Sequence, residues 1–368
     1  MGQDERFMAM ALELARSAKG QTSPNPLVGA VIVQDGQIVG MGAHLKAGEP
    51  HAEVHALRMA GEKAKGATLY VTLEPCGHHG KTPPCAEAVV AAGISRVVVA
   101  VLDPNPLVAG KGIRLLRDSG VEVTVGVCET EATVLNEVFF HYIRTRQPFV
   151  TVKTASTLDG KMATATGHSR WITGEAARSE VHELRRTHDA ILVGVGTILA
   201  DDPELTARVG GERYGRQPVR IILDSELRTP LTARVVADHL APTWIFTTPA
   251  APAEKRMELE TKGLTVIVLD APVQVTDVLR ELGERGITSL LVEGGAEVNG
   301  SFLQAMAIQK IISYISLKLV GGSLSPTSYG GVGFATMDKA VTLTNTSIEQ
   351  VSEQDIRIVG YPQWEPHE

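Results

Sequence analysis

Three potential metal ligands, His51, Cys76 and Cys85, lie within one stretch of this sequence. To bind one ion, they must be brought together by the fold. His51 and Glu53 lie two residues apart, and Cys76 and Cys85 bound a later segment rich in glycine, histidine and proline. One imidazole and two thiolates suit Zn²⁺, and three protein ligands leave a fourth position open for water. Zinc lowers the pKa of such a water to roughly 7, and the nearby glutamate is free to move its protons.

The order H-x-E followed by P-C and a second cysteine is typical of zinc nucleobase deaminases, in which the glutamate is a general acid/base and not a ligand. The cysteines here are further apart than in the general P-C-x-x-C motif. A structural zinc site closed by four protein ligands is the alternative, since His78 or His79 offers a fourth ligand. We expect a catalytic site, because predicted helices at 52–60 and 83–92 would place ligands at helix starts, where thiolates are stabilised.

Length and composition narrow the class of protein. At 368 residues two domains are expected, and 43% apolar with 21% charged residues is typical of a soluble globular chain. No apolar run approaches the ~20 residues that span a membrane, and the acidic, amphipathic N-terminal segment is unlike a signal peptide. Three cysteines, two of them assigned to metal, argue against a disulfide framework and for the reducing cytoplasm.

The charge distribution bears on the substrate. Residues 1–147 hold 15 acidic and 14 basic residues, a net −1, so the remainder carries −6 of the total −7. Neither part has the basic excess of a nucleic-acid binder. The zinc motif alone would equally fit a deaminase of tRNA or single-stranded DNA, but the charge favours a small-molecule substrate.

Helical and strand patterns alternate along the whole chain, which indicates layered α/β domains. In the first part we expect helices at 3–18, 52–60, 83–92, 110–118 and 129–143, and strands at 28–33, 37–44, 68–73, 96–101 and 121–127. In the second part we expect helices at 175–187, 275–284 and 296–306, and strands at 149–155, 190–194, 219–223, 243–246, 264–269, 288–292, 309–319 and 347–359. A proline-terminated linker at 144–148 divides them, so the predicted domains are 1–146 and 147–368.

Two glycine turns in the second part follow predicted strands, at 193–197 and 292–295. Glycines before a helix expose main-chain N–H groups that suit an anion, and two such turns at one sheet edge suit a dinucleotide. A third glycine of the dinucleotide fingerprint is missing, because Leu199 stands there. From the residues alone, tight strand-to-helix turns explain the pattern equally well.

The polar residues of the second part also have plain interpretations. The segment 197–208, with Asp201, Asp202 and Arg208, interrupts the apolar pattern and suits a solvated loop. Lys153 lies within a predicted strand, where a charged side chain more often faces solvent than takes part in catalysis.

Longer strings of the sequence resemble a known family. TSPNPLVGAVIV, HAEVHAL and LEPCGHHGKTPPC resemble the deaminase domain of the bifunctional deaminase/reductase family of riboflavin biosynthesis, the RibD family. KTASTLDGK, SRWITG, VGVGTILADDPELTAR, ILDSELRTP and VEGGAEVNGSF resemble its reductase domain. The resemblance covers nearly the whole chain, and the wide cysteine spacing is the family's own. It implies an N-terminal cytidine-deaminase-like three-layer α/β domain and a C-terminal dihydrofolate-reductase-like domain.

The resemblance also implies two reactions on one pyrimidine ribonucleotide. First, 2,5-diamino-6-ribosylamino-4(3H)-pyrimidinone 5′-phosphate loses its C2 amino group, with Glu53 as the proton shuttle and one zinc per chain held by His51, Cys76 and Cys85. NADPH then reduces C1′ of the opened ribose, which gives 5-amino-6-ribitylaminouracil 5′-phosphate. The alternative is a zinc deaminase whose second domain only binds nucleotide or oligomerises.

Family motifs assign further residues by position. Those implied to contact NADPH are Ala155, Trp171, Thr197, Asp201, Ser225, Gly294 and Gly295. Those implied to hold the substrate in the reductase domain are Ser169, Arg185, Leu205, Arg208 and Glu293, with the two arginines suited to its phosphate. Lys153 and Asp201 are candidates for assisting hydride transfer. Asn25, His44 and Lys81 are candidate base or phosphate contacts in the deaminase domain.

One departure from the family concerns the second domain. Gln309-Lys310 stands where the family has an acidic pair, and the segment at 318–322 lacks the usual proline. We expect these positions to affect packing or dimer contacts before they affect catalysis. A homo-oligomer is expected, without a nucleic-acid or membrane partner.

Overall fold

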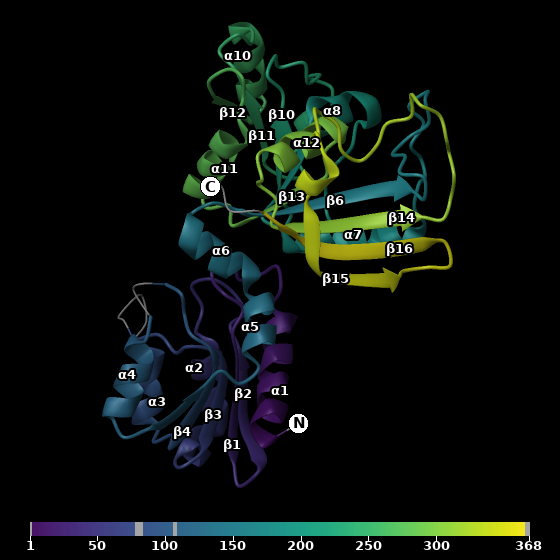
Figure 1. Cartoon of the computed structure of the whole chain (residues 1–368). Coiled ribbons are helices and arrows are strands. Elements are labelled where there is room, and N and C mark those ends of the chain that lie inside the picture. The colour runs from purple at the N-terminus through teal and green to yellow at the C-terminus, as the bar shows by residue number, and fades with distance from the viewer. Residues whose placement is uncertain (1, 78–83, 106–108, 365–368) are drawn as a thin grey trace. The chain divides into compact units, whose positions relative to one another are not determined.

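The computed structural model of this chain describes residues 2–77, 84–105 and 109–364. The chain forms two compact units, Met1–Arg146 and Gln147–Glu368 (Figure 1). Each unit is built around its own sheet with helices packed on it. Within the described ranges, no helix is both long and apolar enough to cross a membrane.

The first unit is a three-layer α/β structure around a sheet in the order β2-β1-β3-β4-β5. β1 pairs antiparallel with β2 and β3, whereas β3, β4 and β5 are parallel. The strands are β1 (Gly29–Gln34), β2 (Gln37–Ala43), β3 (Thr68–Leu73), β4 (Arg96–Val101) and β5 (Glu122–Val125). The helices are α1 (Gln3–Ser17), α2 (Ala52–Ala60), η1 (Gly61–Ala64), α3 (Cys85–Ala91), α4 (Lys111–Asp118), α5 (Glu129–Leu135) and α6 (Glu137–Thr145). α1 and α5 cover one face of the sheet, and α2, α3 and α4 cover the other (Figure 1).

Two glycines allow α2 to lie directly on β2. A Cβ added at Gly40 would come 2.2 Å from the carbonyl oxygen of Ala56, and one at Gly42 would come 2.3 Å from that of Ala52. Real Cβ atoms do not approach main-chain atoms this closely, so any larger residue would displace the helix. The start of α2, where His51 is the N-cap residue, is thereby held against the sheet.

The second unit has a sheet in the order β12-β11-β10-β7-β13-β6-β14-β16-β15. β12 to β14 run parallel, and β16 and β15 add an antiparallel edge. The strands are β6 (Phe149–Thr157), β7 (Ala190–Gly194), β10 (Val219–Leu223), β11 (Thr243–Thr247), β12 (Thr265–Val268), β13 (Ser289–Val292), β14 (Lys310–Ser316), β15 (Thr342–Gln350) and β16 (Asp355–Gln363), with a separate ribbon of β8 (Arg208–Val209) and β9 (Glu212–Arg213). The helices are α7 (Glu175–Thr187), α8 (Val195–Asp201), α9 (Arg234–Ala237), α10 (Ala253–Thr261), α11 (Val275–Glu284), α12 (Ala296–Gln304) and η2 (Met337–Lys339).

Helices cover both faces of this second sheet. α11 and α12 pack with Val152, Leu192 and Phe246 on one face. α8, α9 and α10 pack with Ile191 and Val193 on the other, where α7 also lies against β14. Strand residues therefore alternate between two apolar layers, which explains why the buried strands read as continuous apolar runs.

Two predicted elements differ from the structure because polar contacts interrupt them. The predicted helix at 129–143 breaks at the buried Asn136, whose side chain bonds the N–H and the carbonyl of Leu27 at 2.8 and 2.9 Å. The single strand predicted at 347–359 is wrong. Residues 342–363 form a hairpin of β15 and β16, since the N–H groups of Val351 and Ser352 donate to the carbonyl of Asp355 and close a turn.

Further differences concern helices with weak sequence patterns. The polar stretch expected as a loop begins as α8, and α9 and α10 were not predicted.

Gln309, where the chain departs from the family pattern, forms hydrogen bonds within the second sheet. Its main-chain N–H donates to the carbonyl of Val150 at 3.0 Å, and its side chain accepts from the N–H of Val150 at 2.8 Å.

Candidate functional site

The three predicted metal ligands meet where β3 ends and α2 and α3 begin. Nδ1 of His51 lies 3.2 Å from Sγ of Cys85 and 3.8 Å from Sγ of Cys76. All three ligand atoms lie within 4.8 Å of one another. Zinc binds sulfur at about 2.3 Å and nitrogen at about 2.0 Å, so a single ion placed between these atoms reaches all of them. The donor set and its spacing therefore fit one zinc ion.

The start of α3 fixes Cys76 by both its main chain and its side chain. The N–H of Ala86 donates to the carbonyl of Cys76, and the N–H of Cys85 donates to its sulfur, each at 3.2 Å. Hydrogen bonds from the side chain of Cys85 and from His51 hold the pKa of the Cys76 thiol well below its usual range. The thiolate is the metal-binding form, so this environment favours Cys76 as a ligand, whereas the hydrogen bond with Cys76 and burial raise the pKa of the Cys85 thiol.

Glu53 lies in the first turn of α2, beside the metal ligands, and only 3% of it is exposed. Burial raises the pKa of its carboxyl above the usual range, and this outweighs the lowering by His51. Its Oε2 has no hydrogen-bond partner among the described residues. A buried carboxyl with a raised pKa suits proton transfer near neutral pH.

His44 lies beside this centre, and Asn25 contacts His44; their predicted role as base or phosphate contacts stays a prediction. The ring of His44 meets the ring of His51 edge-on, with centroids 5.3 Å apart. Nδ1 of His44 lies 3.3 Å from the carbonyl of Pro50, so this nitrogen donates, and Nε2 accepts from the side-chain amide of Asn25 at 3.1 Å. Burial lowers the pKa of His44, in agreement with a neutral ring. Lys81, His78 and His79 lie outside the described residues.

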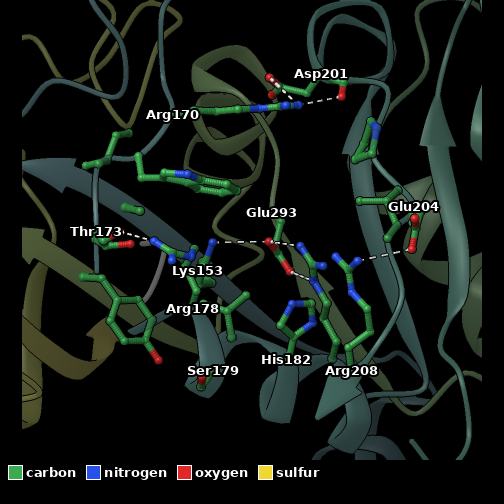
Figure 2. A pocket seen from close by; sticks show the side chains of 18 of the residues that line it. Lys153, Arg170, Thr173, Arg178, Ser179, His182, Asp201, Glu204, Arg208 and Glu293 are labelled. Atoms are coloured by element: carbon green, nitrogen blue, oxygen red, sulfur yellow. Dashed lines mark hydrogen bonds and ion pairs between the residues drawn. The ribbon is translucent and has the colours of Figure 1, made fainter. Parts of the chain in front are cut away.

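The second unit contains a cavity of about 840 Å³ between β6, α7 and the segment 201–211 (Figure 2). Ten of the predicted residues line it: Lys153, Ala155, Ser169, Trp171, Arg185, Asp201, Leu205, Arg208, Glu293 and Gly294. Thr197, Ser225 and Gly295 are not among its lining residues. These three follow β7, β10 and β13, which are adjacent parallel strands, so they lie along the same edge of the sheet.

A buried ion-pair cluster lies in the middle of this cavity (Figure 2). The carboxylate of Glu293 accepts from Nε and Nη2 of Arg185 at 2.7 and 3.0 Å and from Nζ of Lys153 at 3.2 Å. Burial raises the pKa of Glu293, but the positive charges of Arg185 and Lys153 lower it by more. The pKa therefore lies well below its usual range. The side chain of Lys153 is 14% exposed and faces the cavity, which rules out the solvent-facing interpretation.

The rim of the cavity carries a second group of charges. Arg208 lies 3.4 Å from the carboxylate of Glu204. Arg170 donates to the main-chain carbonyl of Asp201 at 2.9 Å and lies 3.9 Å from its carboxylate. The segment predicted as a solvated loop is therefore part of the cavity wall (Figure 2).

The sequence analysis predicted only Arg185 among the lining residues of α7 and missed Arg178 and His182, among others. The guanidinium of Arg178 lies 4.4 Å from the centroid of the Trp171 ring and donates to the carbonyl of Thr173 at 2.7 Å. His182 lies 3.2 Å from the carbonyl of Thr206 through Nδ1, and burial, Arg185 and Arg208 lower its pKa. The signal was present in the sequence, because residues 178, 182 and 185 share one face of a helix.

Comparison with known proteins identifies the family. The model of the cytidine and deoxycytidylate deaminase zinc-binding region matches residues 1–101, and that of the RibD C-terminal domain matches residues 148–356. The riboflavin biosynthesis protein RibD of Bacillus amyloliquefaciens is 51% identical over 360 residues, which cover 98% of this chain and 96% of that protein. The chain belongs to the RibD family. It is thus a bifunctional deaminase and reductase of riboflavin biosynthesis.

Solved structures of RibD proteins have the same fold. RibD of Acinetobacter baumannii is 42% identical, with a TM-score of 0.89 over 98% of this chain and 99% of that one. A Thermotoga maritima protein, named as a diaminohydroxyphosphoribosylaminopyrimidine deaminase/5-amino-6-(5-phosphoribosylamino)uracil reductase, is 39% identical, with a TM-score of 0.85 over 98% and 99% of the chains. The predicted fold class is confirmed, with an N-terminal cytidine-deaminase domain and a C-terminal dihydrofolate-reductase-like domain. His51, Cys76 and Cys85 lie within the residues that match the deaminase zinc-binding region.

Proposed function

We propose that this member of the RibD family carries out two consecutive steps on one pyrimidine ribonucleotide. In the first, 2,5-diamino-6-ribosylamino-4(3H)-pyrimidinone 5′-phosphate loses its C2 amino group by hydrolysis. In the second, its ribosyl group is reduced with NADPH to give 5-amino-6-ribitylaminouracil 5′-phosphate. The observation that carries the proposal is the His51, Cys76 and Cys85 cluster beside the buried Glu53, in the same chain as the cavity around Glu293. The name of the Thermotoga maritima relative supports both steps.

In the deaminase unit, the chain's own groups bind the ion and move protons. Zinc held by His51, Cys76 and Cys85 supplies a Lewis acid that makes water acidic enough to attack C2 at neutral pH. Glu53 accepts one proton from that water and delivers it to the ring nitrogen, and then carries the second proton, from the new C2 hydroxyl group, to the departing amine. Its raised pKa keeps the protonated form accessible between these two transfers. The products are ammonia and the 2-oxo pyrimidine.

The pyrimidine is oriented by the groups next to the ligands. His44 accepts a hydrogen bond from the amide nitrogen of Asn25, which sets the direction of that side chain. The fixed amide can then bind one edge of the pyrimidine. Lys81 is proposed to contact the base or the phosphate.

In the reductase unit, we place NADPH along the carboxyl edge of the sheet. Ala155 lies on β6, and Thr197, Ser225 and the turn at 294–295 follow three neighbouring parallel strands. Such an edge is where dinucleotides bind in open α/β sheets. Gly295 is the N-cap of the nine-residue helix α12, whose first N–H groups suit a pyrophosphate. Trp171 and Asp201, on the cavity wall, complete the proposed contacts.

The substrate of the second step occupies the cavity around Glu293. Arg208 and Arg185 are the proposed phosphate ligands, and Ser169, Leu205 and Glu293 the proposed ribosyl contacts. Bound NADPH would supply the hydride that reduces C1′ of the opened ribose, where a C1′=N bond becomes a C1′–N single bond. Lys153 is the proposed donor of the accompanying proton to nitrogen, because its ion pair with Glu293 holds the ammonium group in place within the cavity. Asp201, on the rim, is the proposed alternative assistant.

A coupled assay of ammonia release and NADPH oxidation tests the proposal. NADPH oxidation should begin only after deamination, and supplying the deaminated pyrimidine should remove that dependence. Steady NADPH consumption would exclude the alternative in which the second unit only binds nucleotide or oligomerises. Ammonia release without any NADPH consumption would instead favour that alternative.

We further propose a homo-oligomer that acts on small molecules and does not bind nucleic acid. The net charge of −7 opposes attraction to phosphate backbones. Light scattering should give a mass of at least twice the 39.3 kDa of one chain. Salt-dependent binding to RNA would contradict the small-molecule proposal.

A further inference from the structure

Glu74, the last residue before Pro75-Cys76, is buried in a cage of main-chain donors, and only 4% of it is exposed. Its Oε2 accepts from the N–H groups of Gly110 at 3.0 Å and Asp103 at 3.4 Å. Its Oε1 accepts from the N–H groups of Gly112 at 3.1 Å and Ile113 at 3.4 Å. Gly110 is the N-cap of α4, so the carboxylate lies where the helix dipole favours negative charge.

The same two segments are also in direct main-chain contact. A Cβ added at Gly112 would come 1.8 Å from the carbonyl oxygen of Pro75, and one at Gly77 would come 2.7 Å from the N–H nitrogen of Gly112. The peptide that carries Cys76 therefore lies against the first turn of α4 without any intervening side chain. The position of Cys76 depends on how firmly this turn is held to the end of β3.

Cys76 is thus fixed from two sides by different kinds of contact. On one side, the start of α3 donates to its carbonyl and to its sulfur. On the other, Glu74 ties residues 74–77 to residue 103 and to residues 110–113, which follow it by 29 to 39 residues in the chain. A single buried carboxylate that satisfies several N–H groups is a rigid anchor, because each donor would otherwise be left unpaired.

We propose that Glu74 is a positioning residue of the metal centre, which sets the direction of the Cys76 thiolate toward His51 and Cys85. It acts through the main chain of residues 75–77 and the first turn of α4. Groups that orient metal ligands in this way usually change metal affinity or activity by about 10–100-fold when they are altered. This inference rests on the proposed zinc site, and its test separates the failure of one from the failure of the other.

The test compares Glu74→Gln with wild type and with Glu62→Gln, which removes an exposed carboxylate of the same unit. Glutamine keeps the size of the side chain but points an amide NH₂ at two of the donors. The full-length proteins are loaded with zinc, and its release to a chelator is timed. The absorption of Co²⁺ loaded in place of zinc reports the geometry of the two thiolates and the imidazole. NADPH oxidation with deaminated substrate shows whether the second unit is intact.

For Glu74→Gln we expect zinc release about tenfold faster or more, an altered Co²⁺ spectrum and a lower kcat for ammonia release at similar KM. NADPH oxidation should match wild type, and Glu62→Gln should match wild type throughout. Zinc release and a Co²⁺ spectrum like those of wild type in a folded Glu74→Gln protein would overturn the inference.

If Glu74→Gln does not fold, the same measurements on Glu74→Asp decide, since aspartate keeps the charge but is too short to reach all donors. Unchanged metal release in that variant would also overturn the positioning role. A wild-type protein that binds neither zinc nor Co²⁺ would instead contradict the proposed metal site itself.

Discussion

Individual side chains at the metal centre have separable roles that substitution can distinguish. His51, Cys76 and Cys85 present the ligand atoms, whereas Glu53 offers a carboxyl whose pKa is raised by burial. A ligand and a proton carrier fail in different ways, because loss of the first removes the ion and loss of the second leaves the ion in place. Metal content and ammonia release are therefore independent measurements of the two roles.

Glu53→Gln should retain zinc and lose ammonia release by about 10²–10⁴-fold, because the amide cannot carry a proton between water and the leaving amine. Cys76→Ser should lose the bound metal, since a hydroxyl replaces one of two thiolates. Metal analysis and an ammonia assay on the same samples measure both effects. A Glu53→Gln protein that deaminates at nearly the normal rate would contradict the proton-shuttle role.

Glu293 makes a pH-dependent contribution to the stability of the second unit. Its folded-state pKa lies below the ordinary value of about 4.3, so the ion pairs with Arg185 and Lys153 stabilise the fold fully above that value. This contribution is lost as the pH falls through the lower, folded-state pKa. Glu293→Gln should therefore cost about 3–5 kcal/mol at neutral pH, because two buried cations lose their partner.

Unfolding measured at several pH values tests this prediction. The difference between wild type and Glu293→Gln should stay constant from about pH 6 to 8 and should narrow below about pH 4. A difference that does not change with acidification would show that the ion pairs are not its source.

At the level of elements, the contact between α2 and β2 sets the position of the start of α2, where the metal ligand His51 lies. Gly42→Ala should destabilise the first unit by about 1–3 kcal/mol and lower its zinc content, because the new Cβ collides with the carbonyl of Ala52. Gly2→Ala is the control, since no atom lies within 4 Å of a Cβ added there. Thermal unfolding and metal analysis give the two readouts. Full zinc content in a destabilised Gly42→Ala protein would separate the packing of α2 from the ligand geometry.

The bounds of several elements were predictable, because apolar residues recur at one regular spacing from the start to the end of each of them. The helices at 52–60 and 175–187 and the strands at 68–73 and 96–101 agree with α2, α7, β3 and β4. The break at Asn136 was not predictable, because its partner Leu27 lies 109 residues away in the sequence. The turn between β15 and β16 was missed because it depends on main-chain hydrogen bonds, in which the carbonyl of Asp355 accepts from the N–H groups of residues 351 and 352.

For the whole molecule, the two units should lose their activities independently. Each has its own sheet and its own candidate site, and the metal ligands all belong to residues 1–146. Chelator treatment of the full-length protein should abolish ammonia release and leave NADPH oxidation with deaminated substrate unchanged. Restoring zinc should restore ammonia release. Loss of NADPH oxidation in the chelator-treated protein would show that the second site also depends on metal.

The sequence by itself determined the ligand set, the alternation of helices and strands and the family, because ligand spacing, apolar periods and long motif strings are local properties. Only the tertiary structure decided that Lys153 faces a cavity, that the helix face with Arg178, His182 and Arg185 forms part of its wall, and that Glu74 anchors the peptide of Cys76. Each of these depends on groups that the chain brings together from distant segments. Which buried donor finds which acceptor is set by how the helices pack on the sheets, and no local pattern encodes that pairing.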